Sequence, residues 1–171
     1  DVRLILRNRL LLVLMAVVLG VAIGARFALP ALDVTLAREG LMTGEGGELR
    51  FADTYSLWVV FIGFWQSALM PGTVFGFLLL DEKEDETLLA MRVSPISMKT
   101  YLRYRVGLPW LIAFFYCILT PQIIGLELLS FPWMIWFAAC GAMVAPVTMM
   151  ALATFAANKV QGLALTKFTG I

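Results

Sequence analysis

The sequence YSLWVVFIGFWQSALMPGTVFGFLLL, residues 55 to 80, contains no charged residue and is followed at once by DEKEDETLLAMRVSPISMKTYLRYR, residues 81 to 105. An uncharged run of this length can cross a hydrocarbon core of about 30 Å as a helix. The charged segment behind it must then lie at one face of a bilayer, where a soluble partner can reach it.

The overall composition is that of an integral membrane protein. Of the 171 residues, 61% are apolar and 15% are charged, and the mean hydropathy is +0.88. Three further apolar runs are long enough to cross a membrane, at about residues 10–29, 106–126 and 133–157. The sequence therefore predicts an all-α, polytopic transmembrane bundle with four spans in one domain, residues 1–171. Residues 33 to 53 are polar and glycine-rich, and we expect them to form an external loop that can begin with a short helix.

Few side chains in this sequence could carry catalysis. There is no histidine, which removes histidine-based metal sites and histidine-dependent nucleophiles. Cys117 and Cys140 lie in apolar runs without a charged neighbour that would favour a thiolate. No G-x-x-x-x-G-K-[ST] phosphate loop occurs, and the net charge of +1 gives no support for nucleic-acid binding. We expect no catalytic, cofactor or metal site here, so that ATP and Mg²⁺, if they drive the protein, bind to another chain.

The predicted spans contain small and polar residues that suggest helix contacts. Gly20 and Gly24 form one G-x-x-x-G pair, and Gly72 and Gly76 form a second small-residue face, which permits a neighbouring helix to approach closely. Proline residues predict bends, at Pro71 in the second span and at Pro146 in the fourth. A hydrogen bond to an adjacent helix is the more usual role for polar side chains such as Gln66 and Ser67 in a span. The candidates to line a transport pathway are Gln66, Ser67 and Gln122.

The distribution of lysine and arginine predicts the orientation. Three of these residues fall on one side of the predicted spans, namely Arg26, Arg38 and Arg50. The others fall on the opposite side: Arg3, Arg7, Arg9, Lys83, Arg92, Lys99, Arg103, Arg105, Lys159 and Lys167. Because cytoplasmic loops carry the excess of basic residues, both ends and residues 81–105 are expected in the cytoplasm.

The charged segment combines an acidic start, an apolar patch and a basic end. Residues 87 to 92 can present Leu88, Leu89 and Met91 as an apolar surface with charges around it, which suits docking into a groove of another protein. Pro95 disfavours a helix at Ser94 and predicts a hinge before the third span. The alternative is an amphipathic loop that rests on lipid headgroups.

This segment also carries a family resemblance. Residues 82–89 (EKEDETLL), 93–97 (VSPIS), Tyr101-Leu102 and Arg105 resemble the segment between the second and third spans of ABC-2 type ABC transporter permeases. The match covers about 25 positions, and the order of spans around it fits most of the chain. Glu86 stands where that family usually has glycine, so the local turn can differ. The portion VSPISMKTYLRYR is similar to the fluoroquinolone-exporter branch.

The resemblance implies an architecture and partners that composition alone does not give. Such permeases have six spans, work as two permease halves, and dock a cytoplasmic ABC ATPase that binds ATP and Mg²⁺. Only four spans occur in this sequence, which suggests a fragment of a longer protein. The implied setting is the plasma membrane of a prokaryote, with a second copy or a paralogue as partner. The residues expected to couple to the ATPase are Glu84, Thr87, Leu88, Met91, Ser94 and Pro95.

Two other classes of function are open to the sequence. A tetraspan scaffold or assembly protein explains the composition equally well, but it gives no reason for the central motif. A membrane-embedded enzyme is disfavoured by the missing histidine and by the lack of paired carboxylates within any span. Copurification with an ATPase would distinguish the transporter hypothesis from the scaffold hypothesis.

Overall fold

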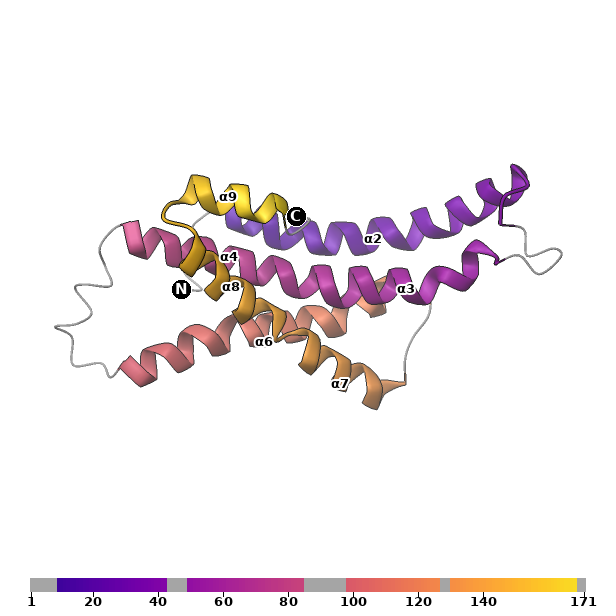
Figure 1. Cartoon of the computed structure of the whole chain (residues 1–171). Coiled ribbons are helices and arrows are strands. Elements are labelled where there is room, and N and C mark those ends of the chain that lie inside the picture. Colours follow the sequence, from indigo (N-terminus) through magenta and orange to yellow (C-terminus); the bar gives the residue numbers. More distant parts are fainter. Residues whose placement is uncertain (1–8, 43–48, 85–97, 127–129, 169–171) are drawn as a thin grey trace.

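The computed structural model describes residues 9–42, 49–84, 98–126 and 130–168 (Figure 1). Every regular element in these ranges is helical: α2 (Arg9–Arg38), η2 (Phe51–Thr54), α3 (Tyr55–Val60), η3 (Phe61–Gln66), α4 (Ser67–Glu84), α6 (Met98–Ile124), α7 (Phe131–Gly141), α8 (Val144–Phe155) and α9 (Lys159–Phe168). Four stretches are long and apolar enough to cross a membrane, namely Met15–Arg38, Phe51–Glu84, Arg103–Ile124 and Phe131–Phe155. The predicted all-α bundle with four spans is confirmed.

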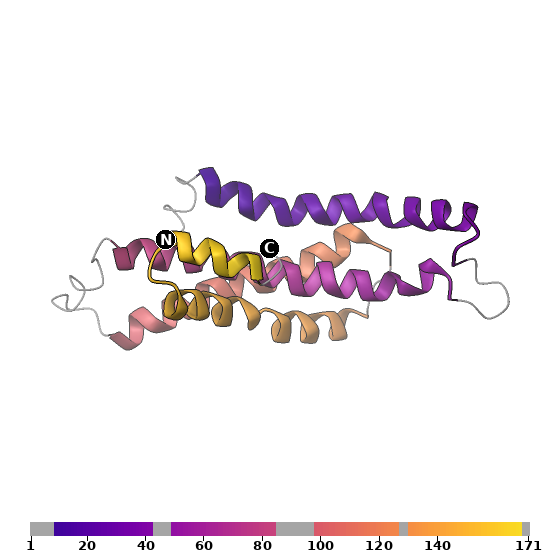
Figure 2. The ribbon, with the colours of Figure 1, turned by 45° about the horizontal axis from the view of Figure 1, so that its top comes forward.

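The second span is the centre of the bundle. In α4, twelve of the eighteen residues are buried, because the helix packs against α2, α6 and α8 (Figure 2). Its closest neighbour is α8: a Cβ atom added at Gly72 would lie 2.5 Å from the carbonyl oxygen of Ala145, and one added at Gly76 would lie 2.6 Å from Cδ1 of Leu152. Gly72 and Gly76 therefore form a helix contact within the chain, as their spacing predicts.

The other glycine pair does not pack inside the described bundle. A Cβ atom added at Gly20 or Gly24 would meet no described atom within 4 Å. This face of α2 points away from the remaining described helices.

The first helix is longer than the apolar run predicts. The run was expected to end near Leu29 and the polar loop to begin at Asp33, yet α2 continues through Pro30 to Arg38. Gly40 then ends the helix with a φ of 71°. The amide of Gly40 donates to the Ala37 carbonyl at 3.2 Å and the amide of Leu41 to the Leu36 carbonyl at 2.9 Å, the bond pattern of a glycine-terminated helix. The first part of the predicted external loop is thus helical.

The fourth span is interrupted one turn earlier than the proline suggests. The expected bend at Pro146 is instead a break at Ala142 and Met143, which separates α7 from α8. A proline ring clashes with the carbonyl four residues before it, which here belongs to Ala142. Pro146 itself lies in the first turn of α8, where its missing N–H leaves no helix bond unmade.

Candidate coupling site

The charged segment connects two helices whose ends lie at the same end of the bundle (Figure 1). α4 ends at Glu84 and α6 begins at Met98. Of the residues expected to couple to an ATPase, Glu84 lies in the described part of the chain. The others lie outside the described residues, and their role stays a prediction: Thr87, Leu88, Met91, Ser94 and Pro95.

An ion pair joins the two helices on either side of this segment. Nη1 of Arg105 on α6 lies 2.9 Å from Oε1 of Glu82 on α4, and the two side chains are only 3% and 16% exposed. The hydroxyl of Tyr101 donates a hydrogen bond of 3.1 Å to Oε2 of Glu82. Tyr101 and Arg105 are four residues apart and therefore share one face of α6. Both oxygens of one carboxylate are thus held by the first turns of the next helix.

The phenol of Tyr101 stays protonated in this contact. Its pKa is raised above the ordinary value of 10.0, mainly because burial disfavours the phenolate. The Glu82 carboxylate raises this pKa further, while the Arg105 guanidinium opposes the shift. The neutral phenol can therefore donate to Glu82 throughout the physiological pH range.

The neighbouring residues of α4 hold α8 and α9. Asp81 forms an ion pair with the Lys159 side chain, and Oε1 of Glu84 accepts a hydrogen bond of 2.9 Å from the Lys159 amide at the start of α9. A carboxylate is favourable there because a helix N-terminus carries a partial positive charge. Nζ of Lys83 donates to the carbonyls of Ala153 and Ala156, at 3.4 and 3.2 Å, near the end of α8.

Residues 81 to 84 and these partners are called the α4 junction below. Successive residues of an α-helix point about 100° apart, so four consecutive side chains can reach three different helices. In this way the last turn of α4 is bonded to α6, α8 and α9 at once. Sequence reasoning identified the acidic and basic residues of this region but missed how they pair.

The three polar residues proposed for a pathway differ in burial and in hydrogen-bond partners, and their role stays a prediction. The hydroxyl of Ser67 is fully buried, 2.7 Å from Oγ1 of Thr120 on α6. Gln122 is exposed, and its Nε2 donates to Sδ of Met134 on α7 at 3.2 Å. Gln66 is half-buried at the end of η3. The sequence-based prediction missed Thr120. A hydroxyl side chain in an apolar span, next to Pro121, was the feature that could have identified it.

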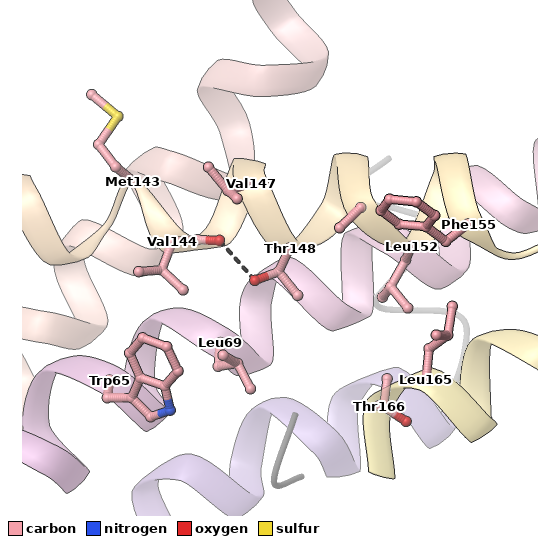
Figure 3. Close-up of a pocket in the computed structure, with 11 residues that line it drawn as sticks. Trp65, Leu69, Met143, Val144, Val147, Thr148, Leu152, Phe155, Leu165 and Thr166 are labelled. Carbon is pink, nitrogen blue, oxygen red and sulfur yellow. Dashed lines mark hydrogen bonds between the residues drawn. The ribbon is translucent and has the colours of Figure 1, made fainter. Parts of the chain in front are cut away.

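An apolar groove runs between the second and fourth spans (Figure 3). Its volume is about 710 Å³, and η3 with α4 lines one side through Trp65 and Leu69. α8 lines the other side, where the Thr148 hydroxyl donates to the Val144 carbonyl of its own helix at 2.8 Å. α9 adds Leu165 and Thr166 to the lining, and the Thr166 hydroxyl donates to the Leu163 carbonyl of its own helix at 2.9 Å. Both threonine hydroxyls bond within their own helices, so the groove is mainly apolar, and its size is that of pockets for drug-sized molecules.

The described residues offer no evident metal site. Within residues 9–42, 49–84, 98–126 and 130–168, no three His, Cys, Asp or Glu side chains gather closely enough to hold an ion.

Four apolar helices with a charged junction at one end define a multi-pass membrane protein. Over residues 1–171 the chain matches the family described as "Fluoroquinolones export permease protein Rv2686c-like", and it belongs to that family. The resemblance to the fluoroquinolone-exporter branch is thereby confirmed.

Two curated relatives come from two strains of Mycobacterium tuberculosis. They are the fluoroquinolones export permease proteins Rv2686c and MT2760, and each is 28% identical over 106 residues, which is 61% of this chain and 42% of the relative. The chain thus spans about two fifths of the length of these relatives. No solved structure matches the chain significantly.

Proposed function

We propose that this chain is part of the membrane-spanning permease subunit of an ABC-type exporter, driven by a separate cytoplasmic ATPase. The observation that carries the proposal is the buried Arg105–Glu82 ion pair, 2.9 Å long, which ties together the two helices that flank the segment 85–97. ATP and Mg²⁺ bind in the ATPase subunit. A second permease copy or a paralogue completes the substrate path.

The contacts of the α4 junction support transmission of force from the charged segment into the bundle. Glu82 lies just before residues 85–97, and Tyr101 and Arg105 lie just after them. A displacement of the segment by a docked ATPase acts on α4 and α6 as one unit, because the junction holds both ends. Lys83 extends the connection to α8, and Lys159 extends it to α9.

The names of the relatives support an export role and a substrate class. Both are called fluoroquinolones export permease proteins. Small, flat, aromatic amphiphiles of that kind are the substrates we propose for this protein. The apolar groove beside Trp65 has room for such a molecule and is our candidate for a section of its route.

The charge distribution supports the orientation. In the proposed topology the α4 junction lies in the cytoplasm, with Lys83, Arg105 and Lys159 among the basic residues on that side. The end of α2 and the turn η2 face outward.

The test uses the full-length permease expressed together with its candidate ATPase. Replacing Leu88 and Met91 by Asp charges the proposed docking patch and leaves the apolar spans unchanged. We expect the double variant to insert in the membrane but to lose the ATPase on copurification, together with ATP-dependent uptake of norfloxacin into inverted vesicles. A matched control is the pair Leu41→Asp and Leu49→Asp, two exposed residues at the other end of the bundle.

Two outcomes would reject this proposal. Normal ATPase binding and transport by the Leu88/Met91 double variant would remove the docking role. Absence of any ATP-dependent transport by the unaltered complex would favour the scaffold interpretation.

A further inference from the structure

The turn η3 (Phe61–Gln66) is π-helical. We propose that η3 is a hinge in the second span and that the hydroxyl of Thr120 holds it in this form. When this hydrogen bond opens, the α3 and α4 sides of the span move relative to each other. The inference concerns the span itself and does not depend on an ATPase. It rests on the hydrogen bonds of η3, on the packing to either side of it, and on Pro71.

The carbonyl groups of η3 and its approach are held by side chains from two helices. The single hydroxyl proton of Thr120 is shared between two carbonyl acceptors, that of Tyr116 in its own helix at 2.6 Å and that of Gly63 in η3 at 2.9 Å. Ser67 donates to the Ile62 carbonyl at 3.1 Å, and its hydroxyl lies 2.7 Å from that of Thr120. Sγ of Cys117 lies 3.5 Å from the Phe64 carbonyl. α6 thus supplies partners that an ordinary α-helix would not need.

The hydrogen-bond ladder is weakened on both sides of Ser67. A π-turn occurs rarely and mostly as a single turn within a longer helix, often at functional positions. On the other side, Pro71 lacks the amide that would bond the Ser67 carbonyl. The stretch from Phe61 to Pro71 is therefore the part of the second span where the backbone itself resists bending least.

Packing differs sharply across this stretch. Most residues of α4 are buried, whereas in α3 only Val59 is buried. The side chains of Leu57 in α3 and Phe61 at the start of η3 are 69% and 54% exposed. Regions with few buried contacts open more readily than a packed core. Val59 anchors the α3 side to a small cluster with Ala22, Leu29 and Ile124, whereas the α4 side is held by α8 and by the α4 junction. The α3 side is therefore the less firmly held part and the one expected to move.

The backbone of Gly63, within the proposed hinge, lies close to the ring of Pro121. A Cβ atom added at Gly63 would lie 2.8 Å from Cγ of Pro121, the residue that follows Thr120. α6 therefore touches η3 at its glycine, where the chain has no side chain in the way. Converting the π-turn to α-helix would turn the α3 side by about 100° relative to α4, since the π-turn holds one additional residue.

The experiment is hydrogen–deuterium exchange on the full-length protein in lipid nanodiscs, read by mass spectrometry. Thr120→Val keeps the shape of the side chain and removes the hydroxyl. We expect exchange in peptides covering residues 61 to 67 to rise by roughly three- to tenfold, as the modest strength of interhelical hydrogen bonds in membranes implies. Peptides from residues 74 to 80 should keep the wild-type rate, because that part of α4 is held by α8.

Two matched variants separate the hinge from general destabilisation. Thr73→Val removes a buried hydroxyl that bonds only the Leu69 carbonyl of its own helix among the described contacts, so it should leave residues 61 to 67 unchanged. Thr120→Ser retains the hydroxyl and should exchange like the wild type. If Thr120→Val cannot be purified, Ser67→Ala should give the same local increase with a smaller amplitude.

The proposal is overturned by either of two results. Exchange in residues 61 to 67 that does not respond to Thr120→Val or Ser67→Ala would mean that the hydroxyls do not hold the π-turn. An increase spread evenly over all four spans would mean that Thr120 is a general packing residue. Both readouts are obtained without ATP, so failure here is distinct from failure of the exporter assignment.

Discussion

Arg105 and Glu82 form a buried ion pair, with Nη1 and Oε1 2.9 Å apart, although the charged segment 85–97 lies between them in the sequence. The pair links α4 to α6, the two helices on either side of those residues.

Breaking the pair should destabilise the protein strongly. Glu82→Gln removes the carboxylate from a largely buried ion pair, and breaking such a pair typically costs about 3–5 kcal/mol. Lys159→Gln removes an ion pair whose lysine is half exposed, and such pairs contribute about 0–1 kcal/mol. Unfolding of the purified protein in mixed micelles measures both. Equal losses of unfolding free energy for Glu82→Gln and Lys159→Gln would contradict the strong burial of Arg105.

Gly72 and Gly24 should respond differently to the same substitution. Gly72→Ala forces a methyl group against the backbone of Ala145, and overpacking of this kind costs about 1–3 kcal/mol. Gly24→Ala meets no described atom and should be neutral or slightly stabilising, because alanine favours a helix. The yield of folded protein and its unfolding midpoint report the difference. A loss at Gly24 equal to that at Gly72 would show that the face of α2 is also packed.

Tyr101 should make stability fall at high pH. Burial raises its pKa above 10.0, so above pH 10 the unfolded chain loses this proton while the folded chain still keeps it. The stabilisation by the neutral phenol is complete below pH 10 and is lost as the pH rises through the pKa of the folded state. Tyr101→Phe should show a smaller loss of stability above pH 10 than the wild type. If the stability of the wild type and of Tyr101→Phe fell equally as the pH rises above 10, the buried contact with Glu82 would be contradicted.

The proposed orientation can be checked with single cysteines at exposed positions. Cys117 and Cys140 are first replaced by alanine, and a cysteine is then placed at Glu39 or at Asn158, which lie at opposite ends of the bundle. An impermeant maleimide applied to intact cells should label position 39 and spare position 158. Labelling of 158 but not 39 would reverse the orientation.

The sequence was informative about spans because hydropathy is a local property. The uncharged run 55–80 and the other apolar runs predicted the four spans, since length and composition alone decide whether a helix can cross a bilayer. The residues at which helices end were harder to predict. Pro30 did not stop α2, because a helix with good helix formers on both sides can continue past a proline whose bond is lost. The break before α8 was placed at Pro146 rather than at the residue with which its ring clashes.

The contacts of the candidate site depend on how helices face one another, which a single sequence does not give. Ser67 was recognised as polar in a span, but its partner Thr120 follows only from the packing of η3 against α6. Likewise, the charges of Glu82 and Arg105 were visible, whereas their pairing requires that α4 and α6 lie side by side. The predicted docking residues from Thr87 to Pro95 lie outside the described part and stay predictions.

The central claim, that the α4 junction passes motion from an ATPase into the spans, is tested most directly by the ratio of transported norfloxacin to hydrolysed ATP in the reconstituted full-length complex. Glu82→Gln should lower this ratio while the ATPase remains bound, since the docking patch is unaltered and only the link between α4 and α6 is broken. The charge exchange Glu82→Arg with Arg105→Glu should restore much of the ratio, and Lys159→Gln serves as the exposed control. An unchanged ratio in folded Glu82→Gln complexes would contradict the account.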